Sequence, residues 1–204
     1  MKKLLAFTLL ALSGAVFAGD DSGEAPRNKP YVMVDSSMER DASTLANDYI
    51  NVNLTMGVKT PSKTEFSVKV GASAKDVSDP SKTNALTNNI EFKVKQSFDV
   101  GAFFLPYVSV RLGEKFDYDT THFTHYAFDA GLKLPLSDKL ALDVGARYRN
   151  SFDTAKLYRS TRIHAMVLFD IDKSNTVGLR YTQSDAQSYT EERKGWRVHY
   201  QRNY

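Results

Sequence analysis

Residues 195–204 decide the fold, and they read Gly195-Trp196-Arg197-Val198-His199-Tyr200-Gln201-Arg202-Asn203-Tyr204. Every second residue from Trp196 onward is aromatic or aliphatic, except Arg202. The residues between them, from Arg197 to Asn203, are all polar. A period of two places each set on its own face of a β-strand. The stretch therefore predicts a strand with one apolar and one polar face.

The same alternation recurs along the chain and predicts ten strands. In residues 48–59, for example, Ile50 and Val52 alternate with Asn51 and Asn53. The ten segments lie near residues 30–37, 48–59, 66–74, 90–98, 104–112, 125–134, 140–149, 162–169, 177–182 and 195–204. We expect an all-β fold, a closed antiparallel transmembrane β-barrel of about ten strands, with eight or twelve as alternatives.

The connections between these segments alternate in length. Short ones are expected at 60–63, 97–102, 135–139 and 171–175, and long polar ones at 38–47, 75–88, 114–124, 151–160 and 184–194. Short periplasmic turns and longer external loops are typical of bacterial membrane barrels. Pro106 predicts a bulge or local break in its strand, because proline lacks the donor that a ladder hydrogen bond needs.

The N-terminal residues predict export. Lys2 and Lys3 precede an apolar run that ends in small residues near Ala18, so we interpret residues 1–18 as a signal peptide. We expect residues 19–29 to be a periplasmic tail and residues 30–204 to be the barrel. Removing Lys2 and Lys3 from the 27 basic residues leaves 25 against 24 acidic residues, which argues against nucleic acid as a partner. The chain has no cysteine.

A strand like residues 195–204, with an aromatic at its end and in a chain with an export signal, resembles the closing strand of bacterial outer-membrane β-barrels. The resemblance implies a location in the outer membrane of a Gram-negative bacterium. It also implies two partners, which are outer-membrane lipid and the barrel assembly machinery that reads the C-terminal strand.

The apolar face is expected to meet lipid, although a soluble lipocalin-like barrel with the apolar set inside also alternates. Two observations favour lipid. The apolar face is nearly free of charge, and its aromatic residues fall near strand ends, as in the belts at membrane interfaces. The outer belt is expected to contain Tyr126, Tyr148, Tyr181 and Trp196, and the periplasmic belt Phe66, Phe98, Phe104, Phe169 and Tyr204.

The polar face carries an excess of cations. Its basic residues are Lys69, Lys93, Lys95, Arg111, Lys133, Arg147, Arg149, Arg162, Arg180 and Arg197, against Glu91, Asp129 and Asp143. The balancing carboxylates are expected mostly in loops. Rings of Lys and Arg in a pore favour anions, and the planar fork of arginine suits carboxylates. We therefore expect a small porin-like conduit or binding lumen for anions or acidic solutes, without a cofactor.

The lumen's basic bias is similar to that of acidic-oligosaccharide porins, such as the oligogalacturonate-specific family. The residues that carry this similarity are the run Asp143-Val144-Gly145-Ala146-Arg147-Tyr148-Arg149 and the run Gly178-Leu179-Arg180-Tyr181. The similarity implies acidic sugars as a class of ligand.

Other functions stay open at this point. A ten-stranded barrel lies near the size at which side chains fill the interior, so a plugged structural barrel is an alternative. Adhesion or receptor function through the external loops is another. A hydrolase is less expected, because Ser160 and His164 lack a nucleophile motif around them. A protease-like or metal-binding cluster in residues 117–125 matches no known ligand spacing, so we expect neither an enzyme nor a metal site.

Overall fold

The computed structural model describes residues 28–41, 49–74, 86–101, 103–116, 122–155, 158–186 and 193–204. The predicted signal peptide, residues 1–18, lies outside the described residues, as do residues 19–27 of the predicted periplasmic tail. The described part of the chain contains no helix that is long and apolar enough to cross a membrane.

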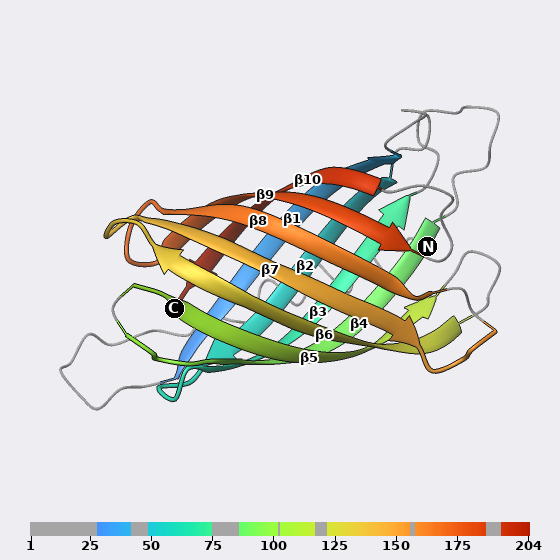
Figure 1. The fold of residues 1–204 in the computed structure, drawn as a ribbon, viewed down its shortest axis with the longest axis horizontal. Helices are drawn as coiled ribbons and strands as arrows, with labels where there is room; N and C mark the ends of the chain where they lie inside the picture. Colours follow the sequence, from blue (N-terminus) through green and yellow to red (C-terminus); the bar gives the residue numbers. More distant parts are fainter. Residues whose placement is uncertain are drawn as a thin grey trace.

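Ten antiparallel strands form a closed barrel, as the alternation predicts (Figure 1). The strands are β1 (Lys29–Asp41), β2 (Tyr49–Lys59), β3 (Thr64–Ala74), β4 (Leu86–Ser97), β5 (Leu105–Phe116), β6 (His122–Pro135), β7 (Leu140–Ser151), β8 (Ser160–Asp170), β9 (Asn175–Ala186) and β10 (Arg193–Asn203). Each strand pairs with its neighbours in sequence, and β1 pairs with β10 to close the barrel.

The predicted closing strand does close the barrel. The register of β1 with β10 runs from Tyr31 opposite Asn203 to Asp41 opposite Arg193. Beyond the end of the strand, the Tyr204 amide donates to the Pro30 carbonyl oxygen at 2.9 Å. No sheet edge is left between these strands, and an open edge is what hydrocarbon does not tolerate.

Several strands extend farther than the sequence indicates. Strand β1 reaches Asp41, so Glu39 belongs to a strand and not to the expected loop 38–47. The break expected at Pro106 is wrong. Pro106 is the second residue of β5 and stays in register opposite Leu132 of β6, while pairing with β4 begins one residue later at Tyr107. A proline at a strand start loses no hydrogen bond to β4.

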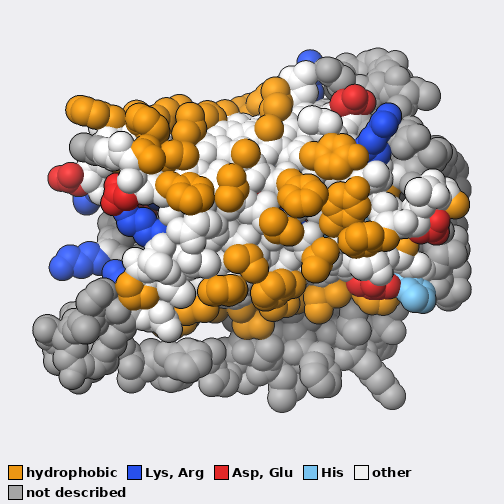
Figure 2. Space-filling view, turned by 60° about the horizontal axis from the view of Figure 1, so that its bottom comes forward, with side chains coloured by type: hydrophobic (Ala, Val, Ile, Leu, Met, Phe, Trp, Pro, Cys, Tyr) orange, Lys and Arg blue, Asp and Glu red, His pale blue; other side chains and the backbone are white. Residues whose placement is uncertain are grey.

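Apolar side chains cover the outer surface of the barrel. Figure 2 shows them gathered across the middle of one face, with charged side chains toward both ends. The exposed fractions of Trp196 (56%) and Phe66 (40%), which lie at opposite ends of the barrel, would be unusual for core residues. Tyr181 contacts Trp196 with a ring-centroid distance of 5.1 Å, which places these two belt residues together. This surface is suited to lipid, as expected, and excludes the lipocalin-like arrangement.

Large polar side chains fill much of the interior by lying over glycines of neighbouring strands. A Cβ on Gly131 would stand 2.5 Å from the Tyr107 ring, and a Cβ on Gly178 would stand 2.1 Å from the ring of His199. Such distances leave no room for any larger residue at the two glycines. Aromatic rings are therefore packed against the barrel wall where these glycines occur.

Candidate functional site

The barrel interior is strongly charged. Among the described strand residues that face inward and are not exposed, thirteen are basic and seven are acidic. The basic ones are Lys59, Lys69, Lys93, Lys95, Arg111, Lys115, Lys133, Arg147, Arg149, Arg162, Arg180, Arg193 and Arg197, and the acidic ones are Asp35, Glu39, Glu65, Glu91, Asp129, Asp143 and Asp170. Four carboxylates that the sequence did not assign to the lumen, Asp35, Glu39, Glu65 and Asp170, therefore also face inward, and the inward set still has an excess of cations. The expectation that the balancing carboxylates lie mostly in loops stays a prediction.

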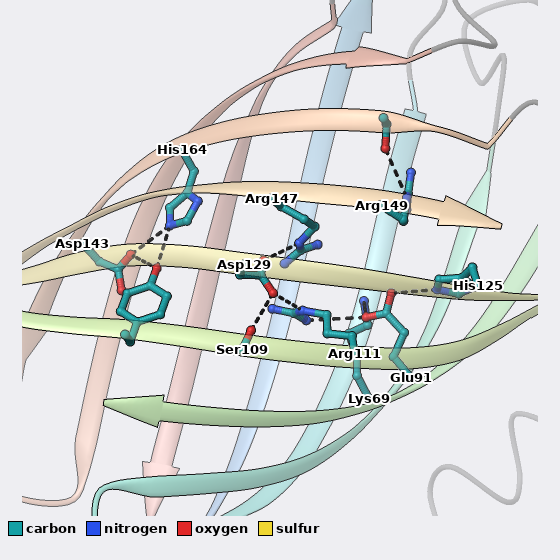
Figure 3. A network of polar contacts seen from close by, with 12 residues as sticks. Lys69, Glu91, Ser109, Arg111, His125, Asp129, Asp143, Arg147, Arg149 and His164 are labelled. Carbon is teal, nitrogen blue, oxygen red and sulfur yellow. Dashed lines mark hydrogen bonds and ion pairs between the residues drawn. The ribbon is translucent and has the colours of Figure 1, made fainter. Parts of the chain in front are cut away.

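A central network of ion pairs crosses strands β3 to β7 (Figure 3). Asp129 is its hub, with oxygens 2.7 Å from Arg111 Nε and 2.5 Å from Arg147 Nε. Glu91 continues the network with an oxygen 2.6 Å from Lys69 Nζ and 3.5 Å from Arg111 Nη1. Both carboxylates are buried, so each cation partner offsets part of the cost of burying a charge.

Two smaller clusters lie beside this network. Asp143 accepts a hydrogen bond from the Tyr107 hydroxyl at 2.8 Å, and His164 Nε2 lies 2.8 Å from the same carboxylate oxygen. Across the barrel, Arg197 Nη1 lies 3.4 Å from Asp35, which also accepts a 2.7 Å hydrogen bond from the Asn53 amide. The middle of the barrel is therefore lined by paired groups.

A further layer lies nearer the external end. Arg162 Nη2 is 3.0 Å from a Glu39 oxygen, and Arg149 Nε donates to Ser160 Oγ at 3.3 Å. The Arg149 guanidinium also stacks over the Tyr158 ring, with its central carbon 4.1 Å from the ring centroid. Arginine stacked on an aromatic face keeps its charge while it packs. Paired cations and aromatic rings thus occupy this end of the lumen.

The other half of the barrel contains a cavity of about 880 Å³. Its wall includes Thr60, Lys63, Lys139 and Lys173 from the short connections, so it lies at the periplasmic end. Its deep end reaches the central network, since Arg111, Asp129 and Arg147 also line it. At the mouth, hydrogen bonds from the Asn175 side chain and the Ser174 amide hold the pKa of the Asp172 carboxyl below its usual value.

The cavity brings together six of the ten predicted lumen cations. These are Lys93, Lys95, Arg111, Lys133, Arg147 and Arg180. The other four, Lys69, Arg149, Arg162 and Arg197, face inward but do not line the cavity. Sequence analysis missed the lining residues Lys59, Glu65 and Asp170. The alternation could have found Glu65, because it continues the polar set of Ser67 and Lys69 by one step toward the turn.

The cations that line the cavity differ in their partners. Lys93 pairs with Glu65, and Lys95 Nζ lies 3.8 Å from the centroid of the Tyr107 ring. Lys133 and Arg180, in contrast, have no hydrogen-bond or ion-pair partner among the described residues. The Nε of Arg180 is buried and unsatisfied. An unpaired buried guanidinium is costly unless water or an anion satisfies it.

The alternative catalytic sites are not assembled in the described structure. Ser160 contacts Arg149, whereas His164 contacts Asp143 and Tyr107 deeper in the barrel, so the two do not form a nucleophile–base pair. Of the expected cluster at 117–125, residues 117–121 lie outside the described residues, and His125 is fully buried beside Glu91. The described residues contain no group of three or more His, Cys, Asp or Glu that could hold a metal ion.

Searches of protein families and of curated proteins gave no match to this chain. Solved structures do resemble it. The translocator domain of the autotransporter NalP from Neisseria meningitidis aligns with a TM-score of 0.51 and 12% identity, covering 100% of this chain and 96% of that one. The NanC porin aligns with a TM-score of 0.55 and 9% identity, covering 83% of this chain and 98% of that one. The closed barrel, its apolar outer surface and these likenesses together show that the chain has the fold of a bacterial outer-membrane β-barrel, which lies across that membrane.

Proposed function

We propose that this barrel is porin-like and binds small anionic solutes in the basic cavity at its periplasmic end. The observation that carries the proposal is the pair of unpartnered cations, Lys133 and Arg180, on the cavity wall. One of the solved structures that this barrel resembles, NanC, is a porin.

The charge balance of the cavity supports an anionic ligand. Its lining contains ten basic residues, Lys59, Lys63, Lys93, Lys95, Arg111, Lys133, Lys139, Arg147, Lys173 and Arg180, and six acidic residues, Glu65, Asp129, Asp138, Asp143, Asp170 and Asp172. A ligand with two or three carboxylates would balance most of this excess. The volume of about 880 Å³ lies within the range of roughly 300–1,000 Å³ that small-molecule sites usually have.

The central network favours binding over free passage. Beyond the deep end of the cavity, Glu91 and Lys69 pair across β3 and β4, and Arg162 and Glu39 pair nearer the external end. Eight-stranded barrels are filled by side chains, whereas barrels of sixteen strands leave a water channel. A solute that crosses this barrel must therefore displace paired charges, while a solute that only binds need not.

We also propose that the barrel assembly machinery recognises β10 when the chain is inserted into the outer membrane.

Titration calorimetry with citrate on the refolded, detergent-solubilised barrel tests the proposal. Citrate should bind, and added salt should weaken the binding because the interaction is between charges. The double substitution Lys133→Gln and Arg180→Gln should lower the affinity at least tenfold, since hydrogen bonds to charged groups contribute about 1.5–3 kcal/mol each.

The matched control is Arg202→Gln, which removes a cation from the outward face of β10 that does not line the cavity. Its affinity for citrate should equal that of the unsubstituted chain. An equal loss in the control and the double variant would show non-specific attraction to a basic protein. Citrate binding that survives the double substitution unchanged would refute the site.

A further inference from the structure

The two cations without a protein partner lie in one row across neighbouring strands. The row consists of Lys133 of β6, Asp143 of β7, Met166 of β8 and Arg180 of β9, each directly opposite the next in the strand register. All of them line the cavity, so their side chains face the same space. Steps of about 4.8 Å between strands separate Lys133 from Arg180 by about 14 Å along the wall. Because the wall curves round the lumen and both side chains are long, one small ligand can bridge the two cations.

The carboxylate between these cations is already engaged. The Tyr107 hydroxyl and His164 Nε2 both lie 2.8 Å from Asp143 Oδ1, and Figure 3 shows the His164 ring turned toward this carboxylate. Asp143 forms its ion pair with His164, and neither Lys133 nor Arg180 pairs with it directly. Its negative charge repels a further anionic group from the middle of the row. Anionic groups of a ligand are therefore favoured at the two ends of the row and not at its centre.

Apolar residues form the wall beside this row. The next inward row toward the periplasmic end consists of Pro135, Ala141, Leu168 and Gly178, again one residue from each strand of β6 to β9. Leu168 lines the cavity together with Met166, the inward residue before it on β8. The wall between the two unpartnered cations is therefore apolar on β8.

We propose that the cavity selects dicarboxylates whose two carboxylates are joined by an apolar spacer, a ligand class that rests on the proposed function and narrows it. One carboxylate accepts hydrogen bonds from the Arg180 guanidinium, whose Nε is buried without a partner, and the other pairs with the Lys133 ammonium. The spacer lies against Met166 and Leu168, where its methylene groups are removed from water. A hydroxylated spacer gives up its hydrogen bonds to water on this wall, and burying an unpaired hydroxyl is unfavourable.

Titration calorimetry of the refolded, detergent-solubilised barrel with adipate and galactarate tests this selection. The two dianions have equal numbers of carbon atoms, but the spacer of adipate consists of methylene groups and that of galactarate of hydroxylated carbons. Adipate should bind at least tenfold more tightly, because each methylene group removed from water raises the affinity about fourfold. Succinate, whose spacer is shorter, should bind more weakly than adipate because it does not bridge both cations.

The substitution Met166→Gln tests the wall itself, because it makes the wall polar at nearly constant side-chain length. It should lower the affinity for adipate at least fivefold and change that for galactarate less than twofold. The matched control is Met33→Gln on β1, which makes the same change on the cavity wall three strands away and should change neither affinity more than twofold.

Met166 is buried, so heat-modifiable migration on a gel first verifies that the variant folds. In addition, Met166→Leu keeps the wall apolar and should retain the affinity for adipate within twofold. Equal affinities for adipate and galactarate, with citrate still bound, would refute the apolar spacer and leave the basic site of the proposed function standing. Unchanged selection by Met166→Gln would refute the role of the β8 wall. Failure of adipate, galactarate and citrate alike to bind would refute the proposed function, and the selection with it.

Discussion

Substitution of Asp129 by Asn should destabilise the barrel more than any other single change of equal size in the lumen. Asp129 is 6% exposed and contacts Ser109, Arg111 and Arg147 at 2.6, 2.7 and 2.5 Å. Asparagine keeps the shape but removes the charge, so two inward guanidiniums lose their shared carboxylate. Removing one partner of a buried ion pair costs about 3–5 kcal/mol, and we expect a loss of that order in the free energy of unfolding.

Urea unfolding of the barrel in lipid vesicles measures this loss. The chain has a single Trp, and Trp196 is 56% exposed on the outer surface, so its fluorescence reports transfer from lipid to water. The matched control is Ser109→Ala, which removes only one neutral donor to the same carboxylate. It should cost about 1.5–3 kcal/mol, the usual contribution of a hydrogen bond to a charged group, and less than Asp129→Asn.

A second variant separates the loss of charge from a general defect in folding. Asp129→Asn leaves Arg147 without its carboxylate, whereas Arg111 keeps Glu91 at 3.5 Å. Adding Arg147→Gln removes that unpaired cation, so the double variant should be more stable than Asp129→Asn alone. Sites in one network are coupled by about 0.5–3 kcal/mol. Two results would refute the assigned role of Asp129. One is a free energy of unfolding of Asp129→Asn within about 1 kcal/mol of the unsubstituted barrel, and the other is a double variant less stable than Asp129→Asn.

Three further changes test the faces and the cavity. Val144→Arg, on the outward face of β7, should cost roughly 2–4 kcal/mol and impair folding into vesicles, as judged by gel migration, and unimpaired folding would mean that this face does not meet lipid. Lys133→Glu with Arg180→Glu should shift the reversal potential of any bilayer conductance toward cations, and an unchanged potential would place both residues off the ion path. Gly178→Ala should lower the free energy of unfolding, measured with urea, by about 1–3 kcal/mol because the new methyl group clashes with the His199 ring. Adding His199→Ala to Gly178→Ala should relieve that clash. If Gly178→Ala costs as much in the chain with His199→Ala as in the original chain, the packing is contradicted.

The architecture of this barrel could be predicted because the constraint is local. Strands that separate lipid from a polar interior must alternate at every residue, so the ten segments and the outward position of Trp196 or Val144 follow from neighbouring residues alone. Strand ends were less predictable. Near the external end both faces become polar, and the period that identifies Glu39 as an inward strand residue fades there.

The arrangement inside the barrel could not be predicted in the same way. From the sequence, Arg147 and Arg180 are equivalent inward cations. In the structure Arg147 shares Asp129 with Arg111, while Arg180 faces the cavity without a partner. The difference depends on the stagger between strands and on which residues meet across the lumen, and neither is encoded in the period of a single strand.

The position of the ion pairs along the chain has a kinetic consequence. In the central network Asp129 lies 18 residues from both Arg111 and Arg147, so these contacts are local in sequence and form within adjacent hairpins. Glu39 and Arg162 are 123 residues apart, and Arg197 meets Asp35 only across the β1–β10 seam. Because loop-closure entropy delays contacts of high sequence separation, the last charges to be neutralised during folding are those beside the seam. In a chain whose barrel has not yet closed, Asp35 and Glu39 of β1 therefore lack the arginines that neutralise them, which come from the final third of the chain.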